Sequence, residues 1–272
     1  MVKFHAFRMG ALSCLGLIIT GTDVLAASGL PTFREGRELY TLLFILLIAV
    51  AVGLFIIRRR NNIELSLTDN TDTKIEFGDI FKESGLIVIP VNEYFDTIVD
   101  DRIIAKNTLH GQFIERYYKD DQNPLKKEIQ KGLKGLIPKV NSARRRGNKN
   151  SYDLGTAVRV DCEGKSFLLI AMTRFNEQDR AEVTWDEYTR VLARLSEHIH
   201  THAQARPVCM PLMGGGQAGV DTPQRLLKNM FITMSLNRKL TLPGGLKIVL
   251  HESVKDKVDL TKIRLELEHT GS

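Results

Sequence analysis

The sequence has little cysteine and no cysteine pattern that binds metal. Its 272 residues contain no CxxC pair. This spacing argues against a disulfide framework and against cysteine-based zinc sites, so the thiols are expected to be reduced. The histidines His198, His200 and His202 alternate and would therefore be spread around a helix, so we expect no metal site and no resident cofactor. The three cysteines are Cys14, Cys162 and Cys209.

Aromatic residues are also scarce, at 7% with one tryptophan, and no internal repeat is present, which excludes a solenoid. The net charge is +6, and much of the basic excess lies at 58–60 and 144–146. The second cluster lies in residues 141–150, which contain no aromatic residue that could stack on a base. We therefore expect a solvated loop there. Nucleic-acid binding is the alternative, and it predicts a steep salt dependence.

One long hydrophobic run is present, at residues 39–57, and it contains no charged residue. As a helix it would be roughly 28 Å long, close to the hydrocarbon thickness of a bilayer. Three arginines, residues 58–60, follow it directly. The run predicts a transmembrane helix.

A second apolar segment, residues 9–22, follows Lys3 and Arg8 and ends before Asp23. A membrane helix over about 6–27 would make a hairpin with 39–57. The alternative is a cleaved signal peptide, since small residues follow at 26–28. Both readings place the remainder in the cytosol by the positive-inside rule. We therefore predict a membrane anchor over 1–60 and a cytosolic domain over 61–272, in a multi-pass protein of the bacterial inner membrane.

From residue 62 onward, the hydrophobic pattern is that of a globular α/β domain. Residues 85–92 form a continuous apolar run, typical of a central strand covered on both faces. Apolar residues recur at helical spacing in 185–204 and 223–236. This alternation predicts a mixed sheet with helices on both faces. The other expected strands are 63–69, 73–77, 155–161, 166–172, 207–212 and 246–250, with 263–267 as a last strand or a tail.

A glycine-rich stretch, CMPLMGGGQAGVDTPQRLLKNM, follows one of these strands and precedes a helix. It has the glycine spacing of a P-loop, but Val220 and Asp221 replace the lysine and the hydroxyl residue. It also matches GxGxxG, but it comes late in the domain and no acidic residue follows to bind a ribose. Two interpretations remain. In the first, the glycine backbone binds an anion at the N-terminus of a helix that Asp221 or Thr222 caps and that has Pro223 in its first turn. In the second, the stretch is a tight turn without a ligand.

Three motifs in this order resemble the macro domains, which bind ADP-ribose: GDI at 78–80, VIPVN ending at Asn92, and PLMGGGQAG at 211–219. The resemblance covers about 63–254. It implies a three-layer αβα domain in which Asp79, with Ile80 beside it, accepts a hydrogen bond from the adenine amino group. It also implies that Asn92 lies near the distal ribose. The implied phosphate loop is Gly214, Gly215, Gly216, Gln217, Ala218 and Gly219.

The chain departs from the macro pattern in the first phosphate loop. The usual second asparagine after the strand is absent, and the loop would be built around 108–111, including His110 and Gly111. The region 118–151 is longer than usual and basic. Since hydrolytic macro domains use this loop to position water, binding is expected and hydrolysis is not. We predict no catalytic residue.

Two membrane helices followed by such a macro domain resemble the membrane-bound effectors of the bacterial Thoeris anti-phage system. The resemblance implies a messenger derived from ADP-ribose, with histidine attached, which a TIR-domain partner makes from NAD. It also implies that binding drives homo-oligomerisation and disruption of the lipid bilayer. The alternative is a membrane-tethered ADP-ribosyl hydrolase or ADP-ribose reader using Asn92, Asp96 or His110.

Overall fold

The structure is a computed structural model, and it describes residues 45–50, 61–176, 180–215 and 219–268. The chain divides into two compact units, Met1–Arg59 and Arg60–Ser272. In the first unit, residues 45–50 are helical, and the rest of the two predicted membrane spans lies outside the described residues. In the portions that are described, no helix combines the length and the hydropathy needed to cross a membrane.

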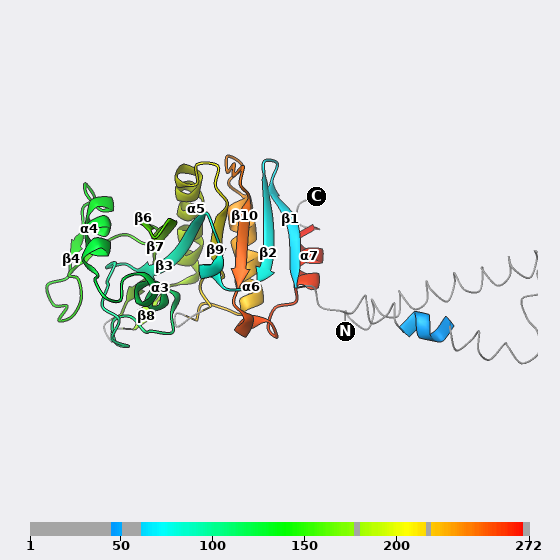
Figure 1. Ribbon diagram of the computed structural model, residues 1–272, viewed down its shortest axis with the longest axis horizontal. Helices are drawn as coiled ribbons and strands as arrows, with labels where there is room; N and C mark the ends of the chain where they lie inside the picture. Colours follow the sequence, from blue (N-terminus) through cyan, green and yellow to red (C-terminus); the bar gives the residue numbers. More distant parts are fainter. Residues whose placement is uncertain (1–44, 51–60, 177–179, 216–218, 269–272) are drawn as a thin grey trace, which may run out of the picture. The chain divides into compact units, whose positions relative to one another are not determined.

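A mixed sheet forms the centre of the second unit (Figure 1). Within the described residues its strand order is β1-β2-β10-β9-β3-β7-β6, with β8 paired to β7. The five strands from β2 to β7 run parallel, whereas β1, β6 and β8 are antiparallel to their neighbours. The strands are β1 (Asn62–Thr68), β2 (Thr71–Phe77), β3 (Leu86–Asn92), β6 (Ala157–Cys162), β7 (Lys165–Phe175), β8 (Ala181–Glu182), β9 (Val208–Pro211) and β10 (Leu246–Leu250).

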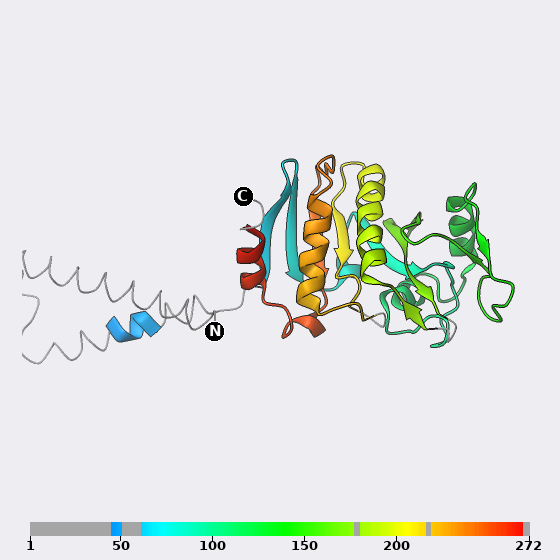
Figure 2. The same cartoon turned by 180° about the vertical axis from the view of Figure 1, so that it is seen from behind.

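Helices cover both faces of this sheet. Figure 2 shows α5 and α6 side by side over one face, with α7 beside β1. On the other face α3 packs on β3 and α4 packs on β6 (Figure 1). The helices are α3 (Leu109–Tyr117), α4 (Asn123–Gly132), α5 (Trp185–His202), α6 (Pro223–Ser235) and α7 (Leu260–Glu268), with short 3-10 turns η1 (Ile80–Lys82) and η2 (Glu252–Val254) and a small hairpin of β4 (Lys139–Val140) and β5 (Asn150–Ser151).

The continuous apolar run of β3 explains the three layers. Leu86 and Val88 belong to the core under α5 and α6, whereas Ile87 and Ile89 belong to the core under α3 and α4. All four side chains have no exposed surface. Since a strand's side chains alternate between faces, a strand that is apolar throughout must be covered on both. The predicted three-layer α/β domain is therefore confirmed.

The core of the described residues lies in the second unit. Every buried apolar residue in the described part of the chain falls between Ile63 and Leu267. Local signals fix the helices around this core: Thr184 and Glu187 form a reciprocal capping box at the start of α5, and Pro223 occupies the first turn of α6. Residues 61–272 therefore carry the contacts that a domain needs to fold by itself.

One prediction from the sequence is wrong. Residues 263–267 are neither a strand nor a tail, because they lie in α7, where Ile263 and Leu267 are buried and Leu265 is 51% exposed. Burial at positions i and i+4 is helical, and the alternating apolar residues were misread as a strand. Residues 141–150 are mostly exposed, as predicted for a solvated loop, but Arg144 is an exception at only 9% exposed. The sequence reading also missed α3 and α4.

Candidate functional site

The predicted site residues lie at one edge of the sheet. Asp79 follows β2, the glycine loop follows β9, and Asn92 ends β3. Because β2, β10, β9 and β3 are parallel, their carboxyl ends meet at this edge. In open α/β sheets, ligands bind beyond the carboxyl ends of the strands. The topology therefore brings the three motifs to one place.

The two carboxylate oxygens of Asp79 have different partners: one accepts a backbone hydrogen bond, and the other forms a weak ion pair. Its Oδ1 accepts a hydrogen bond from the backbone N–H of Phe81 at 3.0 Å, which caps η1. Its Oδ2 lies 3.5 Å from Nη1 of Arg116, and the Asp79 side chain is 33% exposed. The Arg116 guanidinium lies 4.4 Å from the centroid of the Phe81 ring. An exposed ion pair of this kind is weak, so a ligand donor can replace Arg116 at Oδ2.

Ile80, predicted beside Asp79 at the ligand, is 4% exposed and belongs to the core under α3 and α4. Its side chain is therefore occupied in packing.

Asn92 is buried at the end of β3 and organises the chain that follows it. Its Oδ1 accepts hydrogen bonds from the backbone N–H groups of Tyr94 at 3.0 Å and Asp96 at 3.3 Å. Among the described residues, no hydrogen-bond partner is found for its Nδ2. The acceptor is thus used internally, and the amide N–H₂ is available as a donor to a sugar hydroxyl.

The glycine loop leaves β9 through a sharp turn held by α5. Gly214 has a φ of +80°, and a Cβ there would lie 2.9 Å from the ring of Tyr188. The Tyr188 hydroxyl donates to the carbonyl of Met213 at 3.2 Å, and burial raises the pKa of Tyr188, which keeps this donor protonated. The backbone N–H of Val220 donates to the carbonyl of Gly214 at 3.2 Å and closes the loop.

The far end of the glycine loop is the start of α6. Thr222 is the N-cap residue, although its side chain makes no capping hydrogen bond, and Asp221 accepts from the Thr222 backbone N–H at 2.6 Å. Asp221 also pairs with Arg225 at 3.0 Å. The open glycine backbone and the positive end of the helix dipole together form the arrangement that binds anions. Gly215 and Gly219 lie in the described part of this loop, whereas Gly216, Gln217 and Ala218 lie outside it.

The predicted first phosphate loop is the first turn of α3. Thr108 caps the helix by accepting from the Gly111 backbone N–H at 3.1 Å. A Cβ on Gly111 would lie 2.3 Å from the carbonyl oxygen of Ala105, so close packing requires glycine there. His110 is 8% exposed, and burial lowers its pKa to about 4. Both residues thus have packing roles, and their contact with a ligand stays a prediction.

Sequence reasoning named Asp96 as a residue of the hydrolase alternative but missed its buried ion pair with Arg144. Asp96 and Arg144 form a bidentate ion pair in which neither side chain is more than 6% exposed. No local signal joins them, because they are 48 residues apart in the chain. In the described part of the chain, no group of three or more acidic, histidine or cysteine side chains could hold a metal ion.

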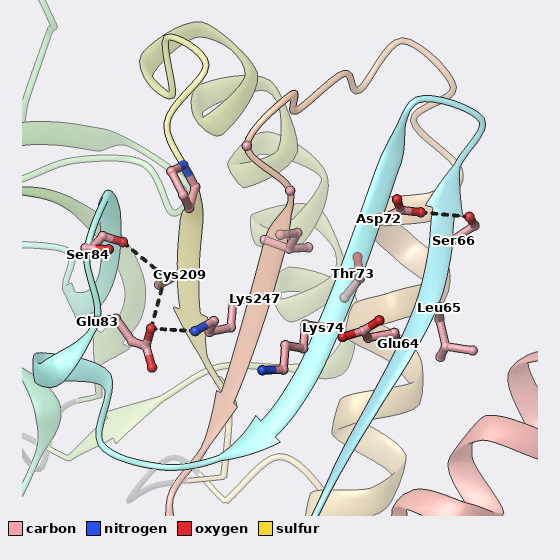
Figure 3. A pocket seen from close by; sticks show the side chains of 14 residues that line it. Glu64, Leu65, Ser66, Asp72, Thr73, Lys74, Glu83, Ser84, Cys209 and Lys247 are labelled. Carbon is pink, nitrogen blue, oxygen red and sulfur yellow. Dashed lines mark hydrogen bonds and ion pairs between the residues drawn. The ribbon is translucent and has the colours of Figure 1, made fainter.

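The pocket in Figure 3 lies elsewhere, toward the amino ends of β2, β9 and β10. There the Lys247 amine contacts Glu83 at 2.8 Å and Glu76 at 3.1 Å, and hydrogen bonds to these carboxylates raise the pKa of Lys247. Cys209 lies beside them, and burial raises its pKa to about 12, so the thiol is protonated. These charges are already paired, and the pocket is remote from the carboxyl edge.

Comparisons with known proteins agree with this geometry. The family described as "Thoeris protein ThsA, Macro domain" matches residues 73–251. The chain is 34% identical to Thoeris protein ThsA of Bacillus amyloliquefaciens (strain Y2) over 287 residues, covering 100% of this chain and 93% of the relative.

Solved structures share the fold at low identity. A mutant Oceanobacillus iheyensis macrodomain with ADPR has a TM-score of 0.54 at 14% identity, covering 76% of this chain and 99% of that one. The same macrodomain with MES bound has a TM-score of 0.52 at 13% identity, covering 77% and 98%.

Proposed function

Because this chain belongs to the family of Thoeris protein ThsA with its macro domain, we propose that it is an anti-phage defence effector whose macro domain binds an ADP-ribose derivative as a signal. Its ligand is a nucleotide messenger and not a resident cofactor. We further propose that the messenger is histidine-ADP-ribose, made by a TIR-domain enzyme of the same system.

The observation that carries the proposal is the order of groups along the carboxyl edge of the sheet. Across the strands, that order is the Asp79 carboxylate after β2, the glycine loop after β9, and the Asn92 amide at the end of β3. An ADP-ribose presents its groups in the same order: an adenine amine, a diphosphate and a ribose. Three strand spacings separate β2 from β3, roughly 14 Å. An extended nucleotide-sugar can therefore reach all three groups.

Each group on the edge has chemistry suited to its proposed partner. The Asp79 Oδ2 is a charged acceptor for an exocyclic amine. Backbone N–H groups of the glycine loop, whose described residues Gly214, Gly215 and Gly219 lie between β9 and the start of α6, would suit a diphosphate. Asn92 contributes an amide N–H₂ for ribose hydroxyls. Together these three groups would contact the whole ligand, with the Asp79 carboxylate at the adenine end and away from the diphosphate.

We propose that the site senses its ligand and does not turn it over. In hydrolytic macro domains the first phosphate loop positions water, and here the corresponding residues form the capped first turn of α3. His110 in that turn is buried and neutral at pH 7, which suits a packing role better than proton transfer.

The output of this sensor would be at the membrane. We propose that residues 1–60 are a membrane anchor with spans at about 6–27 and 39–57, and that the macro domain lies in the cytoplasm. Ligand binding would then favour an oligomeric state that compromises the bilayer. Support comes from the uncharged run at 39–57 and the arginines at 58–60.

One observation favours hydrolysis as a second candidate function. Glu93 directly follows Asn92, and burial raises the pKa of its carboxyl group above the usual range. Its Oε1 accepts from the Phe175 backbone N–H at 3.2 Å. A carboxyl group with a raised pKa beside the ribose position could act as a general acid or base. Release of ADP-ribose from a modified protein, abolished by Glu93→Gln, would favour this alternative.

Calorimetry on residues 61–272 tests the proposed function. The domain is titrated with ADP-ribose, with its histidine conjugate and with NAD, and each mixture is then assayed for turnover. We expect preference for the conjugate without release of product. Equal binding of plain ADP-ribose would favour the reader or hydrolase. Absence of binding by all three would leave the glycine loop as a turn without a ligand.

A further inference from the structure

A buried ion pair joins the loop at 141–150 to residues 93–96, which follow β3. The Arg144 Nη1 and Nη2 atoms lie 3.1 Å and 2.7 Å from the two carboxylate oxygens of Asp96. The Asp96 side chain has no exposed surface, and the Arg144 side chain is 6% exposed. A buried pair needs good geometry and further hydrogen bonds to be stable, and this pair has both.

Aromatic rings complete the surroundings of Arg144. Its guanidinium carbon lies 3.7 Å from the centroid of the Tyr94 ring and 5.2 Å from that of Phe175. The Tyr94 hydroxyl accepts a hydrogen bond from Asn141 Nδ2 at 3.1 Å. A planar cation on a ring face is held in orientation as well as in place.

The loop at 141–150 also holds the backbone of residues 94–96 through Asn148. Asn148 donates from its backbone N–H to Asp96 at 2.7 Å and from its side-chain amide to the carbonyls of Tyr94 and Phe95, at 3.0 Å and 3.2 Å. Phe95 has a φ of +50°, a left-handed conformation that costs a non-glycine residue energy. These hydrogen bonds therefore hold a conformation that the local sequence does not favour.

Asn92 is tied to this cluster from the other side. Its Oδ1 accepts from the backbone N–H groups of Tyr94 and Asp96. The orientation of the Asn92 amide, and hence the direction of its Nδ2 donor, thus depends on where Arg144 and Asn148 hold residues 94–96.

We infer that Arg144 is a positioning residue for the ribose end of the ligand site. It acts through Asp96 on the Asn92 amide and does not itself contact the ligand. The inference rests on the proposed ADP-ribose function and adds a specificity residue to it. It also assigns a role to one of three consecutive arginines, because Arg144 is buried whereas Arg145 and Arg146 are exposed.

The test compares Arg144→Gln with Arg145→Gln in residues 61–272. These variants make the same change in side chain and charge. Each is titrated with ADP-ribose and with ADP, which lacks the distal ribose. We expect Arg144→Gln to weaken ADP-ribose binding by about tenfold, as for a lost hydrogen bond, and to leave ADP binding within about twofold. Arg145→Gln should change neither.

A coupling measurement excludes a general loss of structure. In an Asn92→Ala background, Arg144→Gln should cause little further loss of ADP-ribose affinity, because its target is already absent. In an Asp79→Ala background the two losses should multiply. Should Arg144→Gln fail to fold, a double variant that removes both charges, Asp96→Asn with Arg144→Met, takes its place in the same comparison. The expected results are the same.

Three outcomes would overturn the inference. Unchanged ADP-ribose binding by folded Arg144→Gln would remove the positioning role while the proposed function stands. Equal losses for ADP and ADP-ribose would show that the effect is not confined to the ribose end. If the unaltered domain binds neither of these ligands nor the histidine conjugate of ADP-ribose, the proposed function and the inference are both wrong.

Discussion

Single residues in the candidate site differ in how many of their side-chain atoms the fold already uses. Asp79 and Asn92 each commit one oxygen to backbone hydrogen bonds, and the proposed ligand contacts fall on the other atom, Oδ2 of Asp79 and Nδ2 of Asn92. Gly214 and Gly215 are adjacent, yet only Gly214 has a positive φ and a crowded Cβ position. The residue-scale predictions use these differences.

Asp79→Ala should weaken ADP-ribose binding by about 1.5–3 kcal/mol, because a hydrogen bond to a charged acceptor is lost. Calorimetry with ADP-ribose and with its hypoxanthine analogue, which lacks the amino group, measures this. The unaltered domain should prefer the adenine form, and the variant should not. Asp72→Ala is the matched control, since Asp72 is exposed and follows the start of the same strand. A variant that still prefers adenine would contradict the role of Asp79.

Gly215→Glu should abolish binding without unfolding the domain. Its Cβ would meet Leu226 at 3.7 Å, an ordinary contact, but the added carboxylate would repel the diphosphate. We expect a loss of at least about a hundredfold in affinity, or about 2.7 kcal/mol. Gly214→Ala is the contrasting variant: its φ of +80° and the nearby Tyr188 ring should lower stability by about 1 kcal/mol or more. Calorimetry measures the loss of affinity and thermal denaturation measures the loss of stability. Ligand binding by folded Gly215→Glu would show that the diphosphate does not bind at this loop.

His110 predicts a pH dependence of stability. Its pKa falls to about 4 in the folded domain, against about 6.5 in an unfolded chain. Between these values the unfolded chain binds a proton that the folded domain does not, so stability should fall as pH falls from 6.5 toward 4. The loss is about 3 kcal/mol at pH 4. Urea denaturation across this range should show a flatter profile for His110→Asn than for the unaltered domain. An equally steep profile for the variant would contradict the role of His110.

At the scale of elements, the hydrophobic pattern predicted strands better than it predicted short helices. β3 and β10 were found because their apolar runs reflect burial on both faces of a sheet. α3 and α4 span only 9 and 10 residues, so each offers too few apolar positions for its helical spacing to stand out in the sequence. In α7, three alternating apolar residues imitate a strand, and only packing against β1 distinguishes the two.

The helical register of α7 can be tested by substitution. Ile263→Ala should lower the free energy of unfolding by about 2–4 kcal/mol, because its side chain is fully buried under the sheet. Leu265→Ala, two residues away and half exposed, should change it by less than about 0.5 kcal/mol. Urea denaturation of residues 61–272 measures both. Equal losses for the two variants would favour the strand that the sequence suggested.

At the scale of the whole molecule, the proposal couples a ligand site in one unit to a membrane effect in another. A ligand can shift an assembly equilibrium only if it binds the assembled state more tightly. A nearly complete shift, from 1:99 to 99:1, requires a preference of about 10⁴-fold. An effector must therefore bind its ligand much more tightly in the assembled state, whereas a protein that only binds ADP-ribose need not.

The full chain in lipid vesicles should release an entrapped dye when the histidine conjugate of ADP-ribose is added, and its assembly should grow in parallel. Light scattering in detergent and dye fluorescence in vesicles measure the two. Residues 61–272 alone should bind the ligand and release no dye, because the proposed anchor is missing. Full-chain Gly215→Glu should do neither. Tight binding by the full chain without assembly or release would contradict the effector mechanism.

The sequence by itself determined the class of fold, the resemblance to macro domains and the positions of Asp79, Asn92 and the glycine loop in the chain. These depend on short-range signals, namely strand periodicity, glycine spacing and helix starts, which a linear sequence carries. Only the tertiary structure decided which atoms of these residues are already used, that the turn at His110 is packed, and that Arg144 is buried against Asp96. An ion pair between residues 48 positions apart leaves no local pattern, and an arginine run looks the same whether it faces water or a buried carboxylate.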